Sequence, residues 1–166
     1  MSLMWDILGQ DKAALHPWLL FLRKEMIRMI TRDTTTGAKY EEEVTLAHRH
    51  RGAIDLSKHK LYAYLKDMGI DWHEAICSKL LPDEAYLDGD TLYIYEKKFQ
   101  HVNGSADEKL QTCGFKAAQY RKIAALLGAE EIVYTYILSD WFKQPKYRDV
   151  LAYINATPDC WYEFQN

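Results

Sequence analysis

The sequence predicts an α/β fold with a small mixed central β-sheet flanked by helices. Apolar residues recur at helical spacing through much of residues 17–80, and the pattern then changes to strand-forming residues around a turn within 84–95. A later apolar segment, 132–138, has the length of a buried strand and lies between two helical segments. A hairpin followed by alternating helix and strand is typical of a mixed sheet covered by helices.

The first half of the chain is expected to be mainly helical. Pro17 suits the first turn of a helix, and Ser57 and Asp71 suit helix N-caps. Gly69 suits the end of the helix that Ser57 begins. The expected elements are a helix over 17–31, a loop over 33–37, a helix around 40–47 with Tyr40, Val44 and Ala47 on one face, a helix between 57 and 69, and a short helix over 71–80.

The second half predicts a hairpin, two helices and two further strands. Residues 84–87 and 91–95 are strand-forming, and Asp88-Gly89-Asp90 between them is a strong hairpin signal. A capping-box pattern at 105–108 opens a long helix that is expected to end near Gly128. The remaining elements are a buried strand over 132–138, a helix opened by Pro145 and an edge strand over 161–164.

The composition is that of a globular protein, and 166 residues are expected to form one domain, residues 1–166. No apolar run approaches the roughly 18 residues needed to cross a bilayer, and the N-terminus lacks the pattern of a secretion signal. The three cysteines do not have the spacing of metal ligands. These features predict a cytoplasmic protein in a reducing compartment.

The net charge of −3 argues mildly against a protein that simply coats nucleic acid. A basic surface is still possible, because Lys and Arg residues concentrate between Phe21 and Lys66. Contacts with the phosphates of DNA are expected from Lys39, Arg49, Arg51, Lys109 and Lys116. The alternative for these residues is an ordinary solvated loop or helix face.

The segment 83–100 carries the residues that suggest chemistry. Alternate residues of a strand share a face, so Glu96, Lys98 and Gln100 would lie on the face that begins with apolar residues 92 and 94. The apolar residues imply that other parts of the chain cover this face. A covered face is an unusual place for an anion, a cation and an amide. The other face would hold Tyr93, Tyr95, Lys97 and Phe99.

The length of the hairpin loop decides whether Asp83 joins this face. A two-residue turn at residues 88–89 would pair Asp83 with Ile94, and a four-residue loop would pair it with Glu96. A three-residue loop would turn Asp83 to the opposite face unless a β-bulge restored it. A site that includes Asp83 therefore requires an even loop or a bulge.

Two carboxylates held about 4 Å apart repel each other by about 4 kcal/mol at an effective dielectric constant of about 20. A bound Mg²⁺ would offset the repulsion, because this ion prefers carboxylate oxygens and retained waters. Lys98 would lie beside a metal-bound water, which it could orient or deprotonate. Such a site suits hydrolysis of a phosphodiester by in-line attack of water. The alternative for Glu96 and Lys98 is a solvated pair on an edge strand.

Pro82-Asp83 is followed, thirteen positions after the aspartate, by Glu96-Lys97-Lys98, and Gln100 extends the pattern. This arrangement resembles the PD-(D/E)XK signature of the restriction-endonuclease-like nuclease superfamily. The segment 104–110 (GSADEKL) also resembles type II restriction enzymes. The resemblance covers roughly residues 80–138 and implies a restriction-endonuclease-like fold.

The resemblance also implies roles for individual residues. Asp83 and Glu96 would bind the metal, and Lys98 would act on the attacking water. Gln100 would support the catalytic site. The implied cofactor is Mg²⁺, as one or two ions, for which Mn²⁺ would substitute.

Many members of the superfamily place a further acidic residue from an earlier helix at the metal. Three consecutive glutamates, residues 41–43, are the candidates. Glu43 is preferred and Glu42 is the second choice, because Tyr40 and Val44 mark the buried side of the predicted helix.

The implied activity is that of a Mg²⁺-dependent DNA endonuclease, most similar to type II enzymes of restriction–modification systems. A homodimer would suit cleavage of a short symmetric sequence in double-stranded DNA. Residues 81–166 would then be the catalytic part, and residues 1–80 the part for recognition or dimerisation. Two alternatives stay open: a structure-specific or repair nuclease of the same superfamily, and a nucleic-acid-binding module without activity.

Overall fold

The structure is a computed structural model of the chain, and it describes residues 44–101 and 106–165. These residues belong to one compact unit that spans residues 36–166. The helices and strands are β1 (Ile54–Asp55), α4 (Lys60–Asp67), β2 (Glu84–Asp88), β3 (Thr91–Lys98), α5 (Ala106–Leu110), α6 (Cys113–Leu126), β4 (Glu131–Leu138), α7 (Arg148–Ala156) and β5 (Cys160–Phe164). Short 3₁₀ helices lie at Ala47–Arg49, Trp72–Glu74, Asp140–Lys143 and Pro145–Tyr147.

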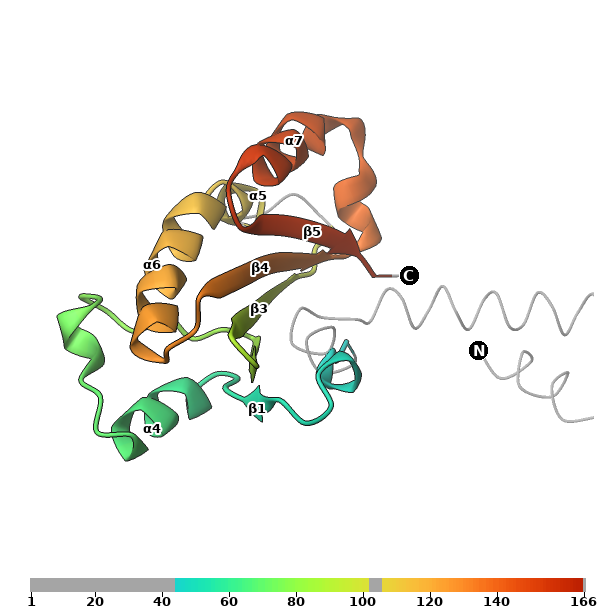
Figure 1. Cartoon of the computed structure of the whole chain (residues 1–166). Helices are drawn as coiled ribbons and strands as arrows, with labels where there is room; N and C mark the ends of the chain where they lie inside the picture. Colours follow the sequence, from blue (N-terminus) through green and yellow to red (C-terminus); the bar gives the residue numbers. More distant parts are fainter. Residues whose placement is uncertain (1–43, 102–105, 166) are drawn as a thin grey trace, which may run out of the picture. The chain divides into compact units, whose positions relative to one another are not determined.

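Within the described ranges, five strands form one mixed sheet in the order β1-β2-β3-β4-β5 (Figure 1). β1, β2 and β3 are antiparallel to one another in turn, whereas β3, β4 and β5 are parallel. The hairpin loop between β2 and β3 is Gly89–Asp90, and Gly89 has a φ of +62°, as the first central residue of a type II′ turn requires. The α/β class with a mixed sheet is therefore confirmed.

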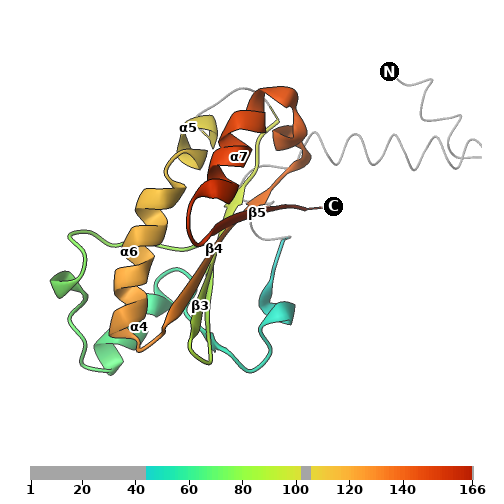
Figure 2. The same ribbon diagram turned by 45° about the horizontal axis from the view of Figure 1, so that its top comes forward.

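The two faces of the sheet are covered by different parts of the chain. Leu92 and Ile94 of β3 lie in the main core, to which α4, α6 and α7 contribute buried residues. Tyr95 lies in a second core on the opposite face with Val44 and Leu46. Figure 2 shows α6 on one side of the strands and the cyan segment that leads into β1 on the other. The predicted alternation of faces along β3 is thus confirmed.

Several predicted elements of the second half are confirmed. The hairpin is β2–β3, the strand over 132–138 is part of β4, and the strand over 161–164 is β5 at the edge of the described sheet. Gly69 and Gly128, which follow α4 and α6, have φ values of +72° and +74°. Glycine adopts this left-handed conformation without strain, so both helices end where the sequence predicts.

The helix predicted around residues 40–47 is wrong in its described part. Residues 44–46 are not helical, and only Ala47–Arg49 forms a 3₁₀ helix. The backbone N–H of Leu46 donates to the carboxylate of Glu84 at 3.0 Å rather than to a helical carbonyl. The predicted helix over 17–31 and the loop over 33–37 lie outside the described residues.

The helix predicted over 71–80 is reduced to Trp72–Glu74. Asp71 does cap it, because its side chain accepts from the backbone N–H of His73 at 3.0 Å. The chain then leaves the helical path, and the Tyr62 hydroxyl bonds both the N–H and the carbonyl of Leu80, at 2.6 and 2.9 Å. A side chain on α4 therefore fixes the far end of this segment.

The preceding helix, α4, begins at Lys60, with His59 rather than Ser57 at its N-cap. The Ser57 hydroxyl instead accepts from the backbone N–H of Ala85 at 3.2 Å. The predicted cap is therefore wrong, because the Ser57 side chain bonds β2, and only its backbone carbonyl contacts α4, where it accepts from the N–H of Lys60 at 3.0 Å.

The long helix predicted from residue 105 to Gly128 is broken between α5 and α6. A continuous helix would bond the N–H of Cys113 to the carbonyl of Lys109. That carbonyl instead accepts from the hydroxyls of Thr112, at 2.7 Å, and Tyr136, at 2.9 Å. The backbone N–H of Thr112 also donates to this carbonyl, at 3.2 Å, so a local turn and a contact with Tyr136 of the distant strand β4 meet at the break. Residue 105 lies outside the described residues.

No helix in the described part of the chain combines the length and the apolar character needed to span a bilayer. The three cysteines are free thiols, of which Cys77 is exposed and Cys113 and Cys160 are buried. Burial raises the pKa of Cys160 to about 12, so this thiol stays protonated. The two buried thiols act as small apolar side chains of the core.

His50 is a buried titratable group of the second core. Its Nε2 lies 2.8 Å from the hydroxyl of Tyr95, and its Nδ1 lies 3.8 Å from the carboxylate of Asp88. The ring centroid lies 4.8 Å from that of Tyr86 and 4.5 Å from that of Tyr93. Burial lowers the pKa of His50 below 6.5, although Asp88 opposes the shift. The other charged groups that act on it are Arg49 and Glu84.

The lowered pKa of His50 predicts a loss of stability in mild acid. As the pH falls through 6.5, the unfolded chain binds a proton at His50 before the folded protein does, and this lowers the free energy of unfolding. The Tm of the wild-type protein should therefore fall more, between about pH 7.5 and about pH 5.5, than the Tm of His50→Phe, which keeps an aromatic ring but does not titrate. Equal falls in the two proteins would contradict this prediction.

Candidate active site

The site forms where the ladder between β2 and β3 stops. Extending the register of Glu84 with Tyr95 by two residues would pair Pro82 with Lys97. Proline has no N–H to donate, and the Pro82 carbonyl accepts instead from the backbone N–H of Lys58 at 2.9 Å. The ladder therefore ends at Glu84, and on the side of β2 the backbone of Lys97 bonds side chains in place of a strand.

Both backbone groups of Lys97 bond residues of the predicted motif. Its N–H donates to Oδ2 of Asp83 at 2.8 Å, and its carbonyl accepts from Nζ of Lys98 at 3.2 Å. The same register, extended by one residue, places Asp83 opposite Glu96. The even loop that a site with Asp83 requires is therefore present, with Gly89–Asp90 as its residues.

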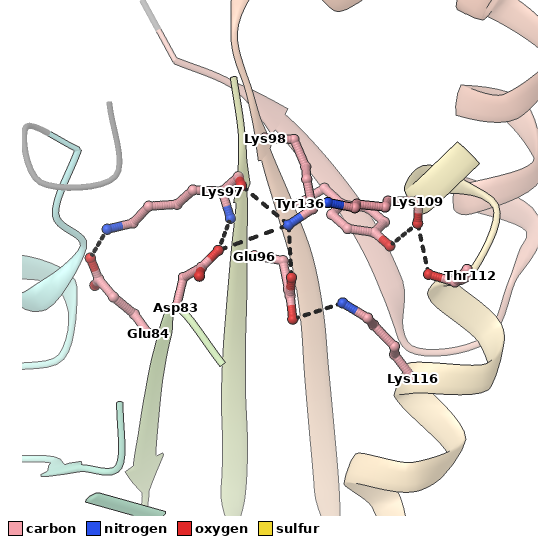
Figure 3. Close-up of polar contacts among 9 residues, drawn as sticks. All are labelled: Asp83, Glu84, Glu96, Lys97, Lys98, Lys109, Thr112, Lys116 and Tyr136. Atoms are coloured by element: carbon pink, nitrogen blue, oxygen red, sulfur yellow. Dashed lines mark hydrogen bonds and ion pairs between the residues drawn. The ribbon is translucent and has the colours of Figure 1, made fainter. Parts of the chain in front are cut away.

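Lys98 connects the two carboxylates. Its Nζ lies 2.8 Å from Oε2 of Glu96 and 3.9 Å from Oδ2 of Asp83 (Figure 3). The Lys98 side chain is only 13% exposed, and Nζ lies 5.9 Å from the ring centroid of Tyr136. The structure thus brings the three motif residues together in a largely buried place at the end of β3.

A second lysine reaches the same carboxylate from α6. Nζ of Lys116 lies 3.0 Å from Oε1 of Glu96, so each oxygen of Glu96 has an ammonium partner. Figure 3 also shows the side chain of Lys109 extending from the end of α5 toward the sheet. Both lysines are among the predicted phosphate contacts, and the contact of Lys116 with Glu96 is the feature that the sequence argument missed.

Tyrosines of the main core lie beneath this cluster. Tyr120 and Tyr134 are fully buried, and their hydroxyls have no hydrogen-bond partner among the described residues. Burial raises the pKa of both above the usual range, and the negative charge of Glu96 adds to the effect. Burial also raises the pKa of Tyr136 to about 12, so its hydroxyl remains the donor that holds the carbonyl of Lys109.

The carboxylates of Asp83 and Glu96 have the ligand chemistry that a hard divalent cation prefers. Mg²⁺ commonly takes one or two protein carboxylates and completes its shell with water. Among residues 44–101 and 106–165, no group of three or more His, Cys, Asp or Glu side chains is arranged to hold a metal. A third protein ligand was predicted at Glu43 or Glu42, and both lie outside the described residues.

Gln100 lies just beyond β3 and is buried. Its backbone N–H donates to Oγ of Ser139, and the same hydroxyl donates to its carbonyl, both at 3.3 Å. These bonds tie the end of β3 to the loop after β4. A supporting role for the Gln100 side chain stays a prediction.

The remaining predicted phosphate contacts are not brought to this cluster. Arg49 pairs with Glu163 of β5 at 2.8 Å, a hydrogen bond that raises the pKa of Arg49, and Arg51 is exposed in the turn before β1. The two arginines come shortly after Val44 and Leu46 in the chain. Those two residues belong to the second core, which lies on the sheet face opposite Glu96 and Lys98. Lys39 lies outside the described residues.

Comparisons of this chain with protein-family models, with curated proteins and with solved structures found no match. Any assignment of function therefore depends on the chemistry and geometry of the site.

Proposed function

We propose that the protein is a Mg²⁺-dependent DNA endonuclease of the PD-(D/E)XK type with a restriction-endonuclease-like fold. The observation that carries the proposal is the convergence of Asp83, Glu96 and Lys98 at the end of the hairpin. Two carboxylates with an ammonium between them are the groups needed to hold a divalent cation and to act on an attacking water. A solvated edge-strand pair does not account for a Glu96 that is only 6% exposed on a central strand.

Each residue of the cluster would contribute to hydrolysis in a different way. Asp83 and Glu96 would hold the ion, which when bound supplies Lewis-acid stabilisation of the phosphate and a more acidic water. Lys98 would orient the attacking water or accept its proton. Lys116 would stabilise the negative charge that develops on the phosphate.

The balance of charge supports a phosphate as substrate. The carboxylates of Asp83 and Glu96 are balanced by the ammonium groups of Lys98 and Lys116. A bound divalent cation would make this neutral cluster positive, and a phosphodiester brings negative charge that increases in the transition state. Lys109, on the same side of the sheet, would add a backbone contact to DNA.

We propose further that the enzyme is a type II restriction endonuclease that acts as a homodimer. Two copies related by a two-fold axis would match a symmetric sequence in double-stranded DNA. Sequencing the cut ends would test this part. One recurring short sequence would support restriction, whereas cuts that follow junctions or nicks would indicate the structure-specific or repair nuclease.

Removal of the metal provides the direct test of the proposed activity. Supercoiled plasmid incubated with the protein and Mg²⁺ should be linearised or nicked, because the ion offsets the charge of the phosphate. Excess EDTA should stop the reaction, and added Mg²⁺ or Mn²⁺ should restore it. Absence of cleavage by a folded protein with either ion, or cleavage that persists in EDTA, would contradict the proposal.

A further inference from the structure

A buried ion pair lies on the opposite side of the hairpin from the candidate site. Nζ of Lys97 lies 2.6 Å from Oε1 of Glu84, and the two side chains are only 4% and 9% exposed. The second oxygen of Glu84 accepts from the backbone N–H of Leu46, at 3.0 Å, and from the hydroxyl of Tyr86, at 2.7 Å. Burial raises the pKa of Tyr86, so its hydroxyl is a donor throughout the neutral range. Glu84 therefore has charged or polar partners on both oxygens.

Stability alone is a weak reason for such a pair. Removing two charges from water costs several kcal/mol per ion, and well-packed apolar residues are often as stabilising as a buried pair. The surrounding second core already contains Tyr95 and Ile137, which would pack against apolar replacements. The position of Glu84 and Lys97 relative to the candidate site provides a stronger reason.

Both members of the pair are sequence neighbours of the candidate catalytic residues. Glu84 follows Asp83, and Lys97 lies between Glu96 and Lys98. Neighbouring residues on a strand point to opposite faces, so the pair lies on one face and the site on the other (Figure 3). Fixing Glu84 to Lys97 on one face therefore fixes the position of Asp83 relative to Glu96 on the other.

The pairing of Glu84 with Lys97 matters because the backbone ladder between β2 and β3 ends at Glu84. Beyond the pairing of Glu84 with Tyr95, Asp83 is held to β3 by the N–H of Lys97 at 2.8 Å. A cavity of about 290 Å³ borders the pair and is lined in part by Asp83, Glu84 and Lys97. Since there is space beside Asp83, packing does not hold it as tightly as a core residue.

We propose that Glu84 and Lys97 are positioning residues, which hold the Asp83 carboxylate in place to bind the metal. This inference rests on the proposed nuclease function. Residues that orient the ligands of a metal typically change metal affinity or activity about 10–100-fold when they are replaced. The pair should act through Asp83, without contact with the ion or the DNA.

The test is the double variant Glu84→Gln with Lys97→Met. It removes both charges together, and glutamine keeps an acceptor for the Leu46 N–H, so the fold should be retained; either single variant leaves one buried charge without its partner. The Mg²⁺ concentration for half-maximal cleavage should rise about 10–100-fold, with kcat at saturating Mg²⁺ close to the wild-type value. Mn²⁺ binding measured by calorimetry should weaken to the same extent.

A matched control is the double variant Asp140→Asn with Lys143→Met. It removes a pair of similar distance, 2.8 Å, whose side chains are 56% and 46% exposed. Its Mg²⁺ requirement should equal that of the wild-type protein. An unchanged Mg²⁺ requirement in the Glu84/Lys97 double variant, or a loss of kcat without a change in Mg²⁺ requirement, would overturn the positioning role.

Amide hydrogen exchange separates this inference from the proposed function. The N–H of Lys97 should exchange faster in the Glu84/Lys97 double variant, because its hydrogen bond to Asp83 is loosened. If the N–H of Lys97 exchanges faster in the variant, but the wild-type protein neither cuts DNA nor binds Mn²⁺, the nuclease is refuted and the structural link to Asp83 stands. Unchanged exchange in the variant of an active enzyme would refute the positioning role and leave the nuclease standing.

Discussion

Replacing Lys98 by alanine is expected to lower the rate of DNA cleavage by about 10²–10⁴-fold, the contribution of a positioned group that transfers or orients a proton. The Nζ of Lys98 lies between Glu96, at 2.8 Å, and Asp83, at 3.9 Å, so its loss removes the ammonium that connects the two carboxylates. Single-turnover cleavage of plasmid at saturating Mg²⁺ measures this effect. DNA binding in Ca²⁺, measured by gel shift, should remain within a few-fold of the wild-type value.

Lys122→Ala is the matched control for this variant. Lys122 is an exposed lysine of α6 that the structure places outside the cluster, and its removal should leave the cleavage rate unchanged. Lys98→Arg tests the chemistry further, because a guanidinium keeps the charge but does not release a proton. Wild-type cleavage by Lys98→Ala would exclude the proposed mechanism.

Glu96→Gln is expected to affect both activity and stability. The change removes the anion that pairs with Lys98 at 2.8 Å and with Lys116 at 3.0 Å, so Lys116 loses this partner and Lys98 keeps only the more distant Asp83, at 3.9 Å. Breaking a buried ion pair on one side costs about 3–5 kcal/mol, and the partial exposure of Lys116 places the expected loss at or below the lower end of this range. Cleavage should fall by at least about 10²-fold, as expected when a group that organises charge at the reacting phosphate is lost.

Urea unfolding and calorimetric titration with Mn²⁺ measure the two effects of Glu96→Gln separately. The free energy of unfolding should fall, and Mn²⁺ should bind more weakly than to the wild-type protein. Glu131→Gln is the control, because Glu131 is an exposed glutamate at the start of the adjacent strand β4. An inert Glu96, with the same activity and Mn²⁺ affinity after substitution, would leave the cluster without a metal-binding role.

Local sequence pattern predicted a large part of the second half of the fold. Alternation along residues 92–98 placed Glu96 and Lys98 on the face of the main core, as observed. The turn signal around Gly89 predicted the hairpin, and its even loop brought Asp83 opposite Glu96. These features depend on residues close together in the chain, where the two-residue period of a strand and the conformational freedom of glycine decide the outcome.

Predictions failed where a contact between distant residues competed with a local pattern. The predicted helix around residues 40–47 is lost where Leu46 donates to Glu84 of β2. The predicted helix from residue 105 is interrupted where Tyr136 of β4 donates to the carbonyl of Lys109. In both places a hydrogen bond to another element replaces one within the helix, and helical periodicity carries no information about such a partner.

The sequence by itself therefore determined the class of fold, the hairpin, and the placing of Glu96 and Lys98 on one face of β3, whereas the register seen in the structure decided that Asp83 joins them. Only the tertiary structure decided that Lys116 of α6 joins Glu96, and that Lys97 and Glu84 form a buried pair behind the site. The first set follows from backbone geometry over a few residues. The second depends on what packs against the two faces of the sheet: α6 brings Lys116 to Glu96 on one face, and the segment of Val44 and Leu46 covers Glu84 and Lys97 on the other.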